Sequence, residues 1–451
     1  MQKRYKGLEA KHWHRFNDNR VECDLCPRHC RTKDGRMGFC GVRGNEGNTL
    51  HTYNYGLSLP ATEETIQTEG VFHYRPGARI LSMGNVGCMM SCSFCQNWQT
   101  SQTKHLDHSR LVKYTSEDLI EICLENNIEI ISWTYDDPVV WHEFVVDTSR
   151  LAHQYGIKTL YKSALYIEER PCAELIDCID IFSISLKSLD DSFYRKHAKA
   201  KLQPVLDRIK QVAASGRHLE ISQLVIPELN DRSEDIAATV DWIKNNLGIE
   251  IPLHFVGFHP AYRYTQVERT AHATLKSARD YALSQGLKYV YLGNTKESES
   301  NETLCEQCGA MLIERSGATV HVKNIHENGT CLSCATPSTI VEALHTLQKK
   351  EVVKESFGAS QTLTFSWTPQ VKSIHLERVF CESDTDILYI REAGTDSIRI
   401  QSVGKGLDRV SINQSHFNER EIEISWYSEN RYRCIPILDR AHFPIVEVVE
   451  N

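Results

Sequence analysis

The sequence has no apolar run that approaches the length of a membrane-spanning helix. Its first five residues, Met1 to Tyr5, are largely polar and basic and lack the apolar core of a secretory signal. The composition, with 41% hydrophobic and 24% charged residues over 451 positions, is that of a globular protein with two or three domains. We therefore expect a cytoplasmic protein without a membrane partner.

The sequence also lacks an excess of positive charge, since its formal net charge is −8. No stretch interleaves arginines with aromatic residues in the manner of a single-stranded nucleic-acid site, so a nucleic-acid partner is not expected. Neither a Gly-x-Ser-x-Gly elbow nor a phosphate-cradling P-loop occurs. These absences argue against a nucleophilic hydrolase and against a P-loop nucleotidase.

Cysteine, in contrast, is abundant, with sixteen residues. Most of them stand in short groups with metal-ligand spacing and are not spread along the chain like a disulfide framework. This usage is typical of a reducing compartment, which a reducible metal cluster also needs.

The central group is Cys88, Cys92 and Cys95, spaced C-x3-C-x2-C after an apolar run at 78–83 that predicts a strand. Three thiolates hold three irons of a [4Fe–4S] cube and leave the fourth iron open, whereas dedicated electron carriers use four cysteines. The cofactor that fits this spacing is S-adenosylmethionine (SAM), whose amino and carboxylate groups chelate the open iron and whose reductive cleavage gives a 5′-deoxyadenosyl radical. Together with Phe94, the segment resembles the radical SAM superfamily. The alternative is a zinc knuckle or free thiols, although zinc favours paired C-x2-C hooks and four ligands.

Two further groups carry four cysteines each. The first, spaced C-x2-C-x3-C-x9-C in a glycine-rich loop, has enough thiols for a zinc ion or a second cluster, with reduced thiols as the alternative; it comprises Cys23, Cys26, Cys30 and Cys40. The second consists of two C-x2-C hooks typical of a structural zinc ribbon, with an additional cluster as the competing interpretation; it comprises Cys305, Cys308, Cys331 and Cys334.

Strand and helix patterns alternate from residue 78 to about residue 300. Beyond the strand at 78–83, we expect strands at 128–134, 157–163, 179–186, 218–226, 253–258 and 288–292, and helices at 115–126, 139–155, 167–177, 203–214, 232–246 and 271–285. This alternation predicts a parallel sheet, and about six repeats predict an open, partial (β/α)6 barrel. Chemistry in such sheets lies at the C-terminal ends of the strands, where the cluster loop is expected.

The rest of the chain divides into three segments. Residues 1–77 form an N-terminal cysteine-rich segment, and residues 301–350 form a zinc-ribbon-like segment with a linker helix from Pro337 to about Lys349. Residues 356–451 alternate apolar and polar side chains, which predicts an antiparallel β-sandwich-like domain of about seven strands, one of them at 445–449. We find no catalytic constellation in that domain.

A sequence of motifs, read in chain order, resembles a narrower family. These motifs are C-x-L-C-P-x-x-C, G-x-C-G-V-R, P-G-x-R, C-x3-C-x2-C-Q-N-W, T-Y-x-x-P, L-V-I-P-x-L-N-D, F-H-P and Y-V-Y-L-G-N. Over about residues 21–336, the chain resembles the radical SAM proteins of the AmmeMemoRadiSam system, relatives of the pyruvate formate-lyase activating enzymes. The resemblance implies the partial barrel, one SAM-cleaving cluster and an association with Memo-like and AMMECR-like proteins. It further implies an electron donor of the flavodoxin or ferredoxin type and a small-molecule, peptide or protein substrate.

The chain departs from that family where SAM is expected to bind. The family's T-Y-x-E-P contains Asp136 and Asp137 here, and either carboxylate can receive the SAM ammonium; the alternative is a carboxylate that caps the following helix. The family's T-N-G includes Lys162 and Ser163 here, and its D-L-K ends in Lys187. We hypothesise that Lys162 supplies the positive charge beside the SAM carboxylate, with Lys187 as a second cation. The alternative is two solvated lysines.

His259, at the end of the sixth strand, either contacts substrate or adenine or is a structural histidine. Two other functions compete with the radical SAM enzyme. One is a cluster-bearing scaffold or sensor that has lost SAM cleavage, because the expected SAM-binding residues differ. The other is a radical SAM modifier of RNA that uses the zinc ribbon as a grip.

Overall fold

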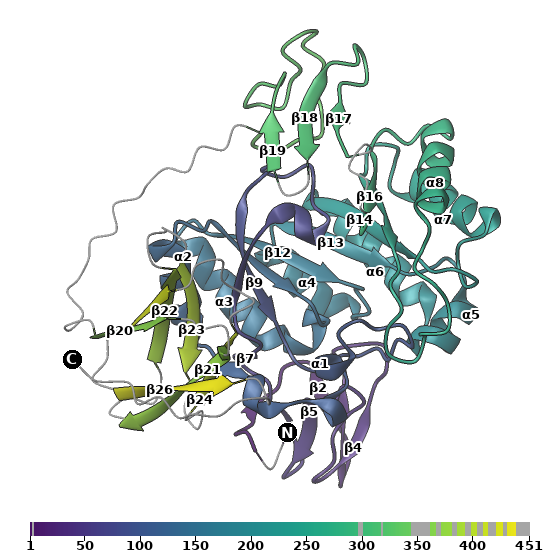
Figure 1. The fold of residues 1–451 in the computed structure, drawn as a ribbon. Coiled ribbons are helices and arrows are strands. Elements are labelled where there is room, and N and C mark those ends of the chain that lie inside the picture. Colours follow the sequence, from purple (N-terminus) through teal and green to yellow (C-terminus); the bar gives the residue numbers. More distant parts are fainter. Residues whose placement is uncertain are drawn as a thin grey trace.

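The computed structural model describes residues 1, 4–295, 301–316 and 319–343, and beyond them the backbone of seven strands between residues 361 and 438 (Figure 1). The centre of the molecule is an eight-stranded sheet in the order β16-β15-β14-β13-β12-β11-β9-β8. Its strands are β8 (Thr62–Thr65), β9 (Arg79–Gly84), β11 (Ile130–Thr134), β12 (Lys158–Ser163), β13 (Ile181–Leu186), β14 (His218–Val225), β15 (Leu253–Gly257) and β16 (Val290–Gly293).

All neighbouring strands from β9 to β16 pair in parallel, and β8 pairs antiparallel with β9 at one edge. β8 and β16 are the two ends of the sheet, so it curves without closing. The expected open, partial barrel is therefore observed, with one additional antiparallel strand that the sequence pattern did not indicate.

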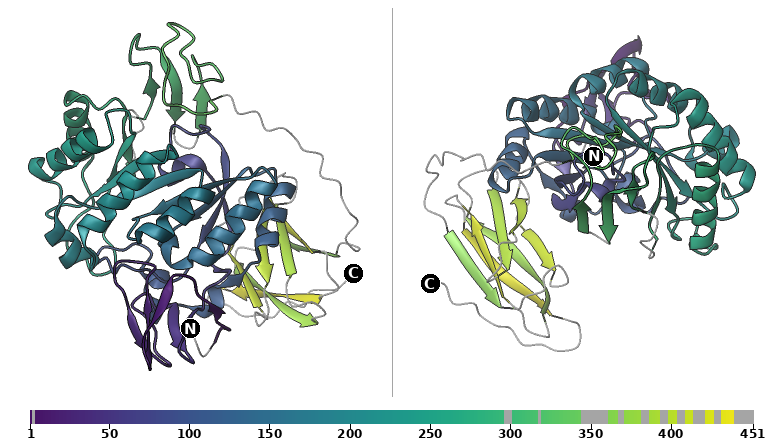
Figure 2. Two further views of the ribbon diagram at one scale, coloured as in Figure 1. Left: turned by 180° about the vertical axis from the view of Figure 1, so that it is seen from behind. Right: turned by 90° about the horizontal axis from the view of Figure 1, so that it is seen from above.

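Helices connect the parallel strands and lie on the outer face of the curved sheet (Figure 2). They are α2 (Ser116–Glu125), α3 (His142–Gln154), α4 (Glu169–Cys178), α6 (Leu202–Ala214), α7 (Ser233–Asn246) and α8 (His272–Ser284). Each lies within a few residues of its expected range. The start of α2 shows why: the Thr115 hydroxyl accepts a hydrogen bond from the Asp118 amide, and the Asp118 carboxylate accepts one from the Thr115 amide, which closes a capping box.

The apolar core lies between the sheet and these helices, and it contains large buried side chains such as Trp133 and Phe144. The inner face of the sheet is different, because it carries polar groups that include the half-buried Lys162 and the buried Ser183 and Glu220. Polar side chains inside a barrel are costly unless they are hydrogen-bonded, so we expect this face to bind a polar group and not to serve as an apolar core.

The N-terminal segment folds into small antiparallel sheets below the barrel (Figure 1). Its strands are β1 (Leu8–Glu9), β2 (Trp13–Asn17), β3 (Arg20–Cys23), β4 (Arg31–Lys33), β5 (Arg43–Glu46) and β6 (Thr49–Thr52). A fully buried ion pair joins the segment to the barrel, with Arg43 Nη1 at 2.8 and 3.0 Å from the two carboxylate oxygens of Glu143 on α3.

Residues 301–343 form a small sheet of β17 (Thr303–Leu304), β18 (Met311–Ser316) and β19 (Thr319–Val322) beside the cysteine hooks. The linker helix expected from Pro337 is wrong for the described residues up to 343. Pro337 pairs with Thr330 and Val341 pairs with Tyr74 as isolated bridges, and the Thr339 hydroxyl lies 2.6 Å from Nδ1 of His73. These contacts to the barrel hold the segment extended; residues 344–349 lie outside the described part of the chain.

Seven strands of the C-terminal segment are described by their backbone, in one sheet of four and one of three. They are β20 (Gln361–Ser366), β21 (Val371–Phe380), β22 (Asp386–Glu392), β23 (Ile398–Val403), β24 (Arg409–Asn413), β25 (Glu421–Trp426) and β26 (Arg431–Leu438). All their pairings are antiparallel, as expected; the strand expected at 445–449 lies outside the described residues. Among the described helices, none is long and apolar enough to cross a membrane.

Candidate metal and cofactor site

The loop with the central cysteines follows β9, at the C-terminal edge of the sheet. Gly87 begins it with φ of +82°, and a Cβ there would lie 2.7 Å from Val42 and 2.8 Å from the Cys40 carbonyl oxygen. Glycine is therefore required for both reasons. Backbone hydrogen bonds fix the loop from the opposite side: the Ser93 amide donates to the His197 carbonyl at 2.8 Å, in the π-helical turn η5 (Tyr194–Ala198).

Cys88, Cys92 and Cys95 line one cavity of about 600 Å³ at this edge. Burial raises the pKa of all three thiols, that of Cys95 to about 11. Among the described residues, three or more ligand atoms lie within 4.8 Å of one another at three places, and this loop is not one of them. A single zinc ion would hold its sulfurs about 3.8 Å apart, given a Zn–S distance near 2.3 Å. The three sulfurs therefore do not all lie at the separations of ligands that share one zinc ion.

The two neighbouring aspartates have different environments. Asp137 is occupied: its carboxylate accepts hydrogen bonds from the Ala164 amide at 2.9 Å, the Ser163 hydroxyl at 2.8 Å and the Val139 amide at 3.2 Å. It also caps the short helix η4 (Pro138–Trp141). This is the helix-capping role that was the alternative interpretation of the sequence.

Asp136 has no such partners. Its side chain lines the cavity and is buried, yet neither carboxylate oxygen accepts a hydrogen bond. The neighbouring Thr100 hydroxyl donates instead to the Asn97 carbonyl at 3.1 Å. Burial raises the pKa of Asp136 well above its usual range. A buried carboxylate without donors is costly, so this position fits a group that brings its own hydrogen-bond donors and positive charge.

The two lysines also differ. The ammonium of Lys162, on β12, donates to the Glu69 carbonyl at 2.7 Å, to the Ser183 hydroxyl at 2.9 Å and to the Ser222 hydroxyl at 3.4 Å, so its three protons are used. Burial lowers its pKa. Lys162 therefore holds three strands and the turn before β9 together at the base of the cavity.

Lys187 follows β13 and lines the same cavity. Its ammonium makes no hydrogen bond or ion pair with any residue that the structure describes. Burial opposes its charge, yet the neighbouring Cys92, Tyr194 and Asp137 raise its pKa above the usual value. Lys187 is thus a cation held close to the three sulfurs and ready to meet an anionic group.

The sequence did not point to a further polar network inside the barrel. Glu220 accepts hydrogen bonds from the Phe72 and His73 amides at 2.9 and 2.7 Å, and its two oxygens lie 2.9 and 2.7 Å from Nε2 of His218 and His254. These histidines hold the pKa of Glu220 well below its usual range, although burial acts in the opposite direction. Alternation along β14 would have placed Glu220 inside the barrel, but its partners come from distant segments.

His259, expected either to contact substrate or adenine or to be a structural histidine, is not among the residues that line the cavity. His254, on the inner face of β15, does line it and was not singled out from the sequence. Ser163 lines the cavity while its hydroxyl donates to Asp137. The structure therefore brings together Cys88, Cys92, Cys95, Asp136, Asp137, Lys162, Ser163 and Lys187, but leaves His259 outside.

The N-terminal cysteines adjoin the cluster loop. Cys23, Cys26, Cys30 and Cys40 line one small closed cavity together with Arg43 and Met89, the residue after Cys88. Arg28 donates to the Met89 and Lys199 carbonyls and stacks on the Phe39 ring at 3.4 Å. No three of the four sulfurs lie within 4.8 Å of one another, so they too are spaced more widely than the ligands of one ion.

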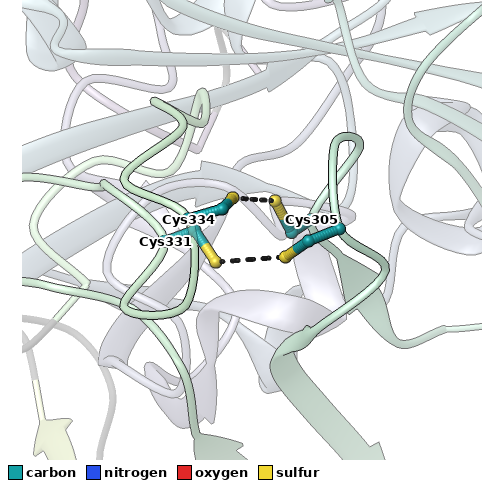
Figure 3. A group of neighbouring side chains, drawn as sticks. Cys305, Cys331 and Cys334 are labelled. Carbon is teal, nitrogen blue, oxygen red and sulfur yellow. Dashed lines mark hydrogen bonds between the residues drawn. The ribbon is translucent and has the colours of Figure 1, made fainter.

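The ribbon cysteines, in contrast, are close together. The sulfurs of Cys305 and Cys334 are 3.5 Å apart and those of Cys308 and Cys331 are 3.7 Å apart, facing one another from the two hooks (Figure 3). All four ligand atoms lie within 4.8 Å of one another. These distances match the separation of about 3.8 Å expected around tetrahedral zinc.

Comparisons with known proteins agree with this geometry. A family model described as the radical SAM superfamily matches residues 84–243, which span the cluster loop and most of the parallel strands. An uncharacterised protein of Methanocaldococcus jannaschii is 36% identical over 334 residues, which are 74% of this chain and 99% of that protein.

Two characterised relatives are more distant. The (2S)-3-sulfopropanediol dehydratase activating enzyme of Klebsiella oxytoca is 27% identical over 115 residues, 26% of this chain and 36% of that enzyme. A dual-specificity RNA methyltransferase of Campylobacter fetus is 23% identical over 285 residues, 58% of this chain and 75% of that enzyme.

Proposed function

Because the chain belongs to the radical SAM superfamily, we propose that it binds a [4Fe–4S] cluster on Cys88, Cys92 and Cys95 and cleaves SAM reductively. When bound, the cluster and SAM together supply a 5′-deoxyadenosyl radical that abstracts hydrogen from a substrate. The observation that carries the proposal is one cavity that holds three widely spaced cysteines, an unpartnered carboxylate and an unpartnered ammonium.

The unpartnered groups match the amino and carboxylate ends of SAM. Asp136 is the acceptor for the N–H groups of its amino group, and Lys187 is the cation for its carboxylate. The buried residues around them exclude water from the site, which strengthens both interactions. Asp137 and Lys162 act indirectly: the first positions the turn that presents Asp136, and the second fixes the base of the cavity.

The N-terminal cysteines hold a second iron–sulfur cluster in this proposal. Their sulfurs are too far apart for one zinc ion, and Met89, the residue after Cys88, lines their cavity. Arg43, buried beside Cys23, offsets the negative charge that such a cluster carries. This position makes the second cluster the entry point for electrons from a flavodoxin-type or ferredoxin-type donor.

The ribbon cysteines hold a structural zinc ion, because their spacing is that of a tetrahedral site. The substrate is a small molecule, a peptide or a protein, and the match to an activating enzyme favours a protein among these. Memo-like and AMMECR-like proteins are the proposed partners, and the cytoplasm is the proposed compartment. An RNA substrate is the second candidate, favoured by the match to the RNA methyltransferase.

Anaerobic reconstitution tests the proposal. Protein reconstituted with iron and sulfide is incubated with dithionite and SAM, and 5′-deoxyadenosine is measured by liquid chromatography. We expect formation by the natural chain and by Cys172→Ala, a control at a buried cysteine on α4, and no formation by Cys92→Ala. If the protein holds an intact cluster but forms no 5′-deoxyadenosine, the proposed enzymatic activity is overturned in favour of a cluster-bearing scaffold.

A further inference from the structure

A second group of potential ligands lies on the outer side of the barrel, away from the cavity just described. Nε2 of His12 and Nε2 of His142 are 3.2 Å apart, and each lies 2.9 Å from the same oxygen, Oε2 of Glu174. The three atoms come from three segments: the turn between β1 and β2, the first residue of α3, and the middle of α4. We propose that these residues bind one divalent first-row transition-metal ion.

The triangle of atoms is difficult to explain by hydrogen bonds alone. The carboxylate oxygen only accepts, and each Nε2 offers one in-plane direction, as either an N–H or a lone pair. If both rings donate to Glu174, two N–H groups stand 3.2 Å apart; if one ring donates to the other, the remaining lone pair faces the carboxylate. A cation at the centre takes a lone pair from all three atoms at once.

The distances fit a metal ion quantitatively. With metal–nitrogen and metal–oxygen distances near 2.0–2.2 Å, ligand atoms lie about 3.3–3.6 Å apart in a tetrahedral site and about 2.8–3.1 Å apart at neighbouring octahedral positions. The two observed separations of 2.9 Å fall in the octahedral range, and that of 3.2 Å lies between the two ranges. Two histidines and a carboxylate are ligands that suit zinc and also iron(II), so the class of ion is a divalent transition metal of this kind.

The backbone at His12 is held in place for this role. His12 has φ of +53°, in the left-handed region that a histidine seldom adopts. Its neighbour Lys11 donates its amide to Glu143 at 2.8 Å and its carbonyl accepts from buried Arg43, while the His12 carbonyl accepts from the Asp24 amide at 2.8 Å. Strain that the surroundings enforce at one residue is typical of a functional position.

The deepest ligand is His142, which is fully buried and whose Nδ1 makes no hydrogen bond with any described residue. The second oxygen of Glu174 is held by Arg150 at 3.4 Å and by Lys11 at 3.6 Å, which leaves Oε2 free for the ion.

The site is open on one side. His12 and Glu174 line a surface cavity of about 720 Å³, whereas His142 lies beneath it. Three protein ligands with an open position is the arrangement of catalytic zinc sites, in which water or an anion completes the coordination. The bound ion would also fasten the N-terminal segment, which carries the first four cysteines, to α3 and α4.

Metal analysis tests the proposal on the full chain. The Cys308→Ser background removes the ribbon's ion, and protein purified anaerobically in that background is dialysed against zinc, then analysed by mass spectrometry for zinc, iron and manganese. We expect about one non-cluster metal ion per chain, lost in His142→Asn and in Glu174→Gln. His153→Asn is the matched control, because His153 lies on the same helix and pairs with Asp180 at 2.8 Å.

Cobalt gives a second readout. Co²⁺ bound at this site should show ligand-field absorption without the sulfur charge-transfer band that cysteine ligands produce. The proposed site would be overturned if the Cys308→Ser background held no non-cluster metal. It would also be overturned if His142→Asn and Glu174→Gln left the metal content unchanged, whether or not these variants fold well. The outcome is independent of SAM cleavage, because it counts ions in the absence of SAM.

Discussion

The two adjacent aspartates allow a sharp prediction, because isosteric changes at neighbouring positions should have opposite effects. In Asp136→Asn, the variant loses a carboxylate that makes no hydrogen bond in the protein. Removing a buried group that resists ionisation leaves stability unchanged or raises it. The SAM amino group, in contrast, loses a charged acceptor with a net contribution of about 1.5–3 kcal/mol, so SAM affinity should fall about 10- to 150-fold.

In Asp137→Asn, the variant keeps one acceptor oxygen where the natural carboxylate uses two. At least one of the donors Ala164 N–H, Ser163 O–H and Val139 N–H is then left unsatisfied in a buried turn. That loss should reduce the free energy of unfolding by about 1–3 kcal/mol.

Both variants are measured in two ways. Chemical denaturation of the chain without SAM gives stability, and anaerobic equilibrium dialysis with reconstituted protein gives SAM affinity. The reasoning is refuted if Asp136→Asn binds SAM as tightly as the natural chain, or if the destabilised variant is Asp136→Asn and not Asp137→Asn.

The remaining predictions concern the lysines, the ribbon and acid stability. Lys162→Met should lower the free energy of unfolding by about 2–4 kcal/mol, because three acceptors lose the ammonium that donates to them, although the Glu69 carbonyl still accepts from the Ser183 hydroxyl. Lys187→Met should instead weaken SAM binding about tenfold or more and leave denaturation curves within about 1 kcal/mol of the natural chain. Equal effects of the two changes on stability would contradict these roles. Cys308→Ser should lower zinc by about one ion per chain without changing the yield of 5′-deoxyadenosine, as metal analysis and chromatography would reveal. Burial lowers the pKa of His73 to about 3 in the folded chain, against about 6.5 in the unfolded chain. Its contribution to stability is therefore complete above pH 6.5 and is lost on acidification by up to about 1.4 kcal/mol per pH unit. Between pH 7.5 and 5.5, His73→Gln should lose less free energy of unfolding than the natural chain, and an equal loss would exclude this histidine as a cause.

The fold was largely predictable because its signals are local. Period-two and period-3.6 apolar patterns and caps such as Thr115 with Asp118 lie within single elements, and they gave the parallel strands and their helices. The antiparallel β8 was not predictable, because Thr62–Thr65 is short and polar and pairs with β9 only in the folded chain, where Arg79 also binds Glu63. The linker helix failed because Val341 and Thr339 bind to His73, more than 260 residues away in sequence.

The metal ligands of the candidate site were predictable from the sequence, but the roles of its charged residues were less so. Cysteine spacing is a local signal, so the three groups of cysteines could be found directly. Which of Asp136 and Asp137 is free, and which of Lys162 and Lys187, depends on partners such as Glu69, Ser183 and Ala164 that only the folded chain brings near. The group of His12, His142 and Glu174 had no sequence signal, since His12 is 130 and 162 residues away from the other two and has a left-handed backbone.

The most direct test of the central claim is electron paramagnetic resonance of a dithionite-reduced chain in which Cys23, Cys26, Cys30 and Cys40 are replaced by alanine. This variant isolates the cluster assigned to Cys88, Cys92 and Cys95. The account predicts the signal of a reduced [4Fe–4S] cluster whose spectrum changes when SAM is added, because one iron is open to it. A chain that holds no such cluster, or one whose spectrum SAM leaves unchanged, would contradict the account.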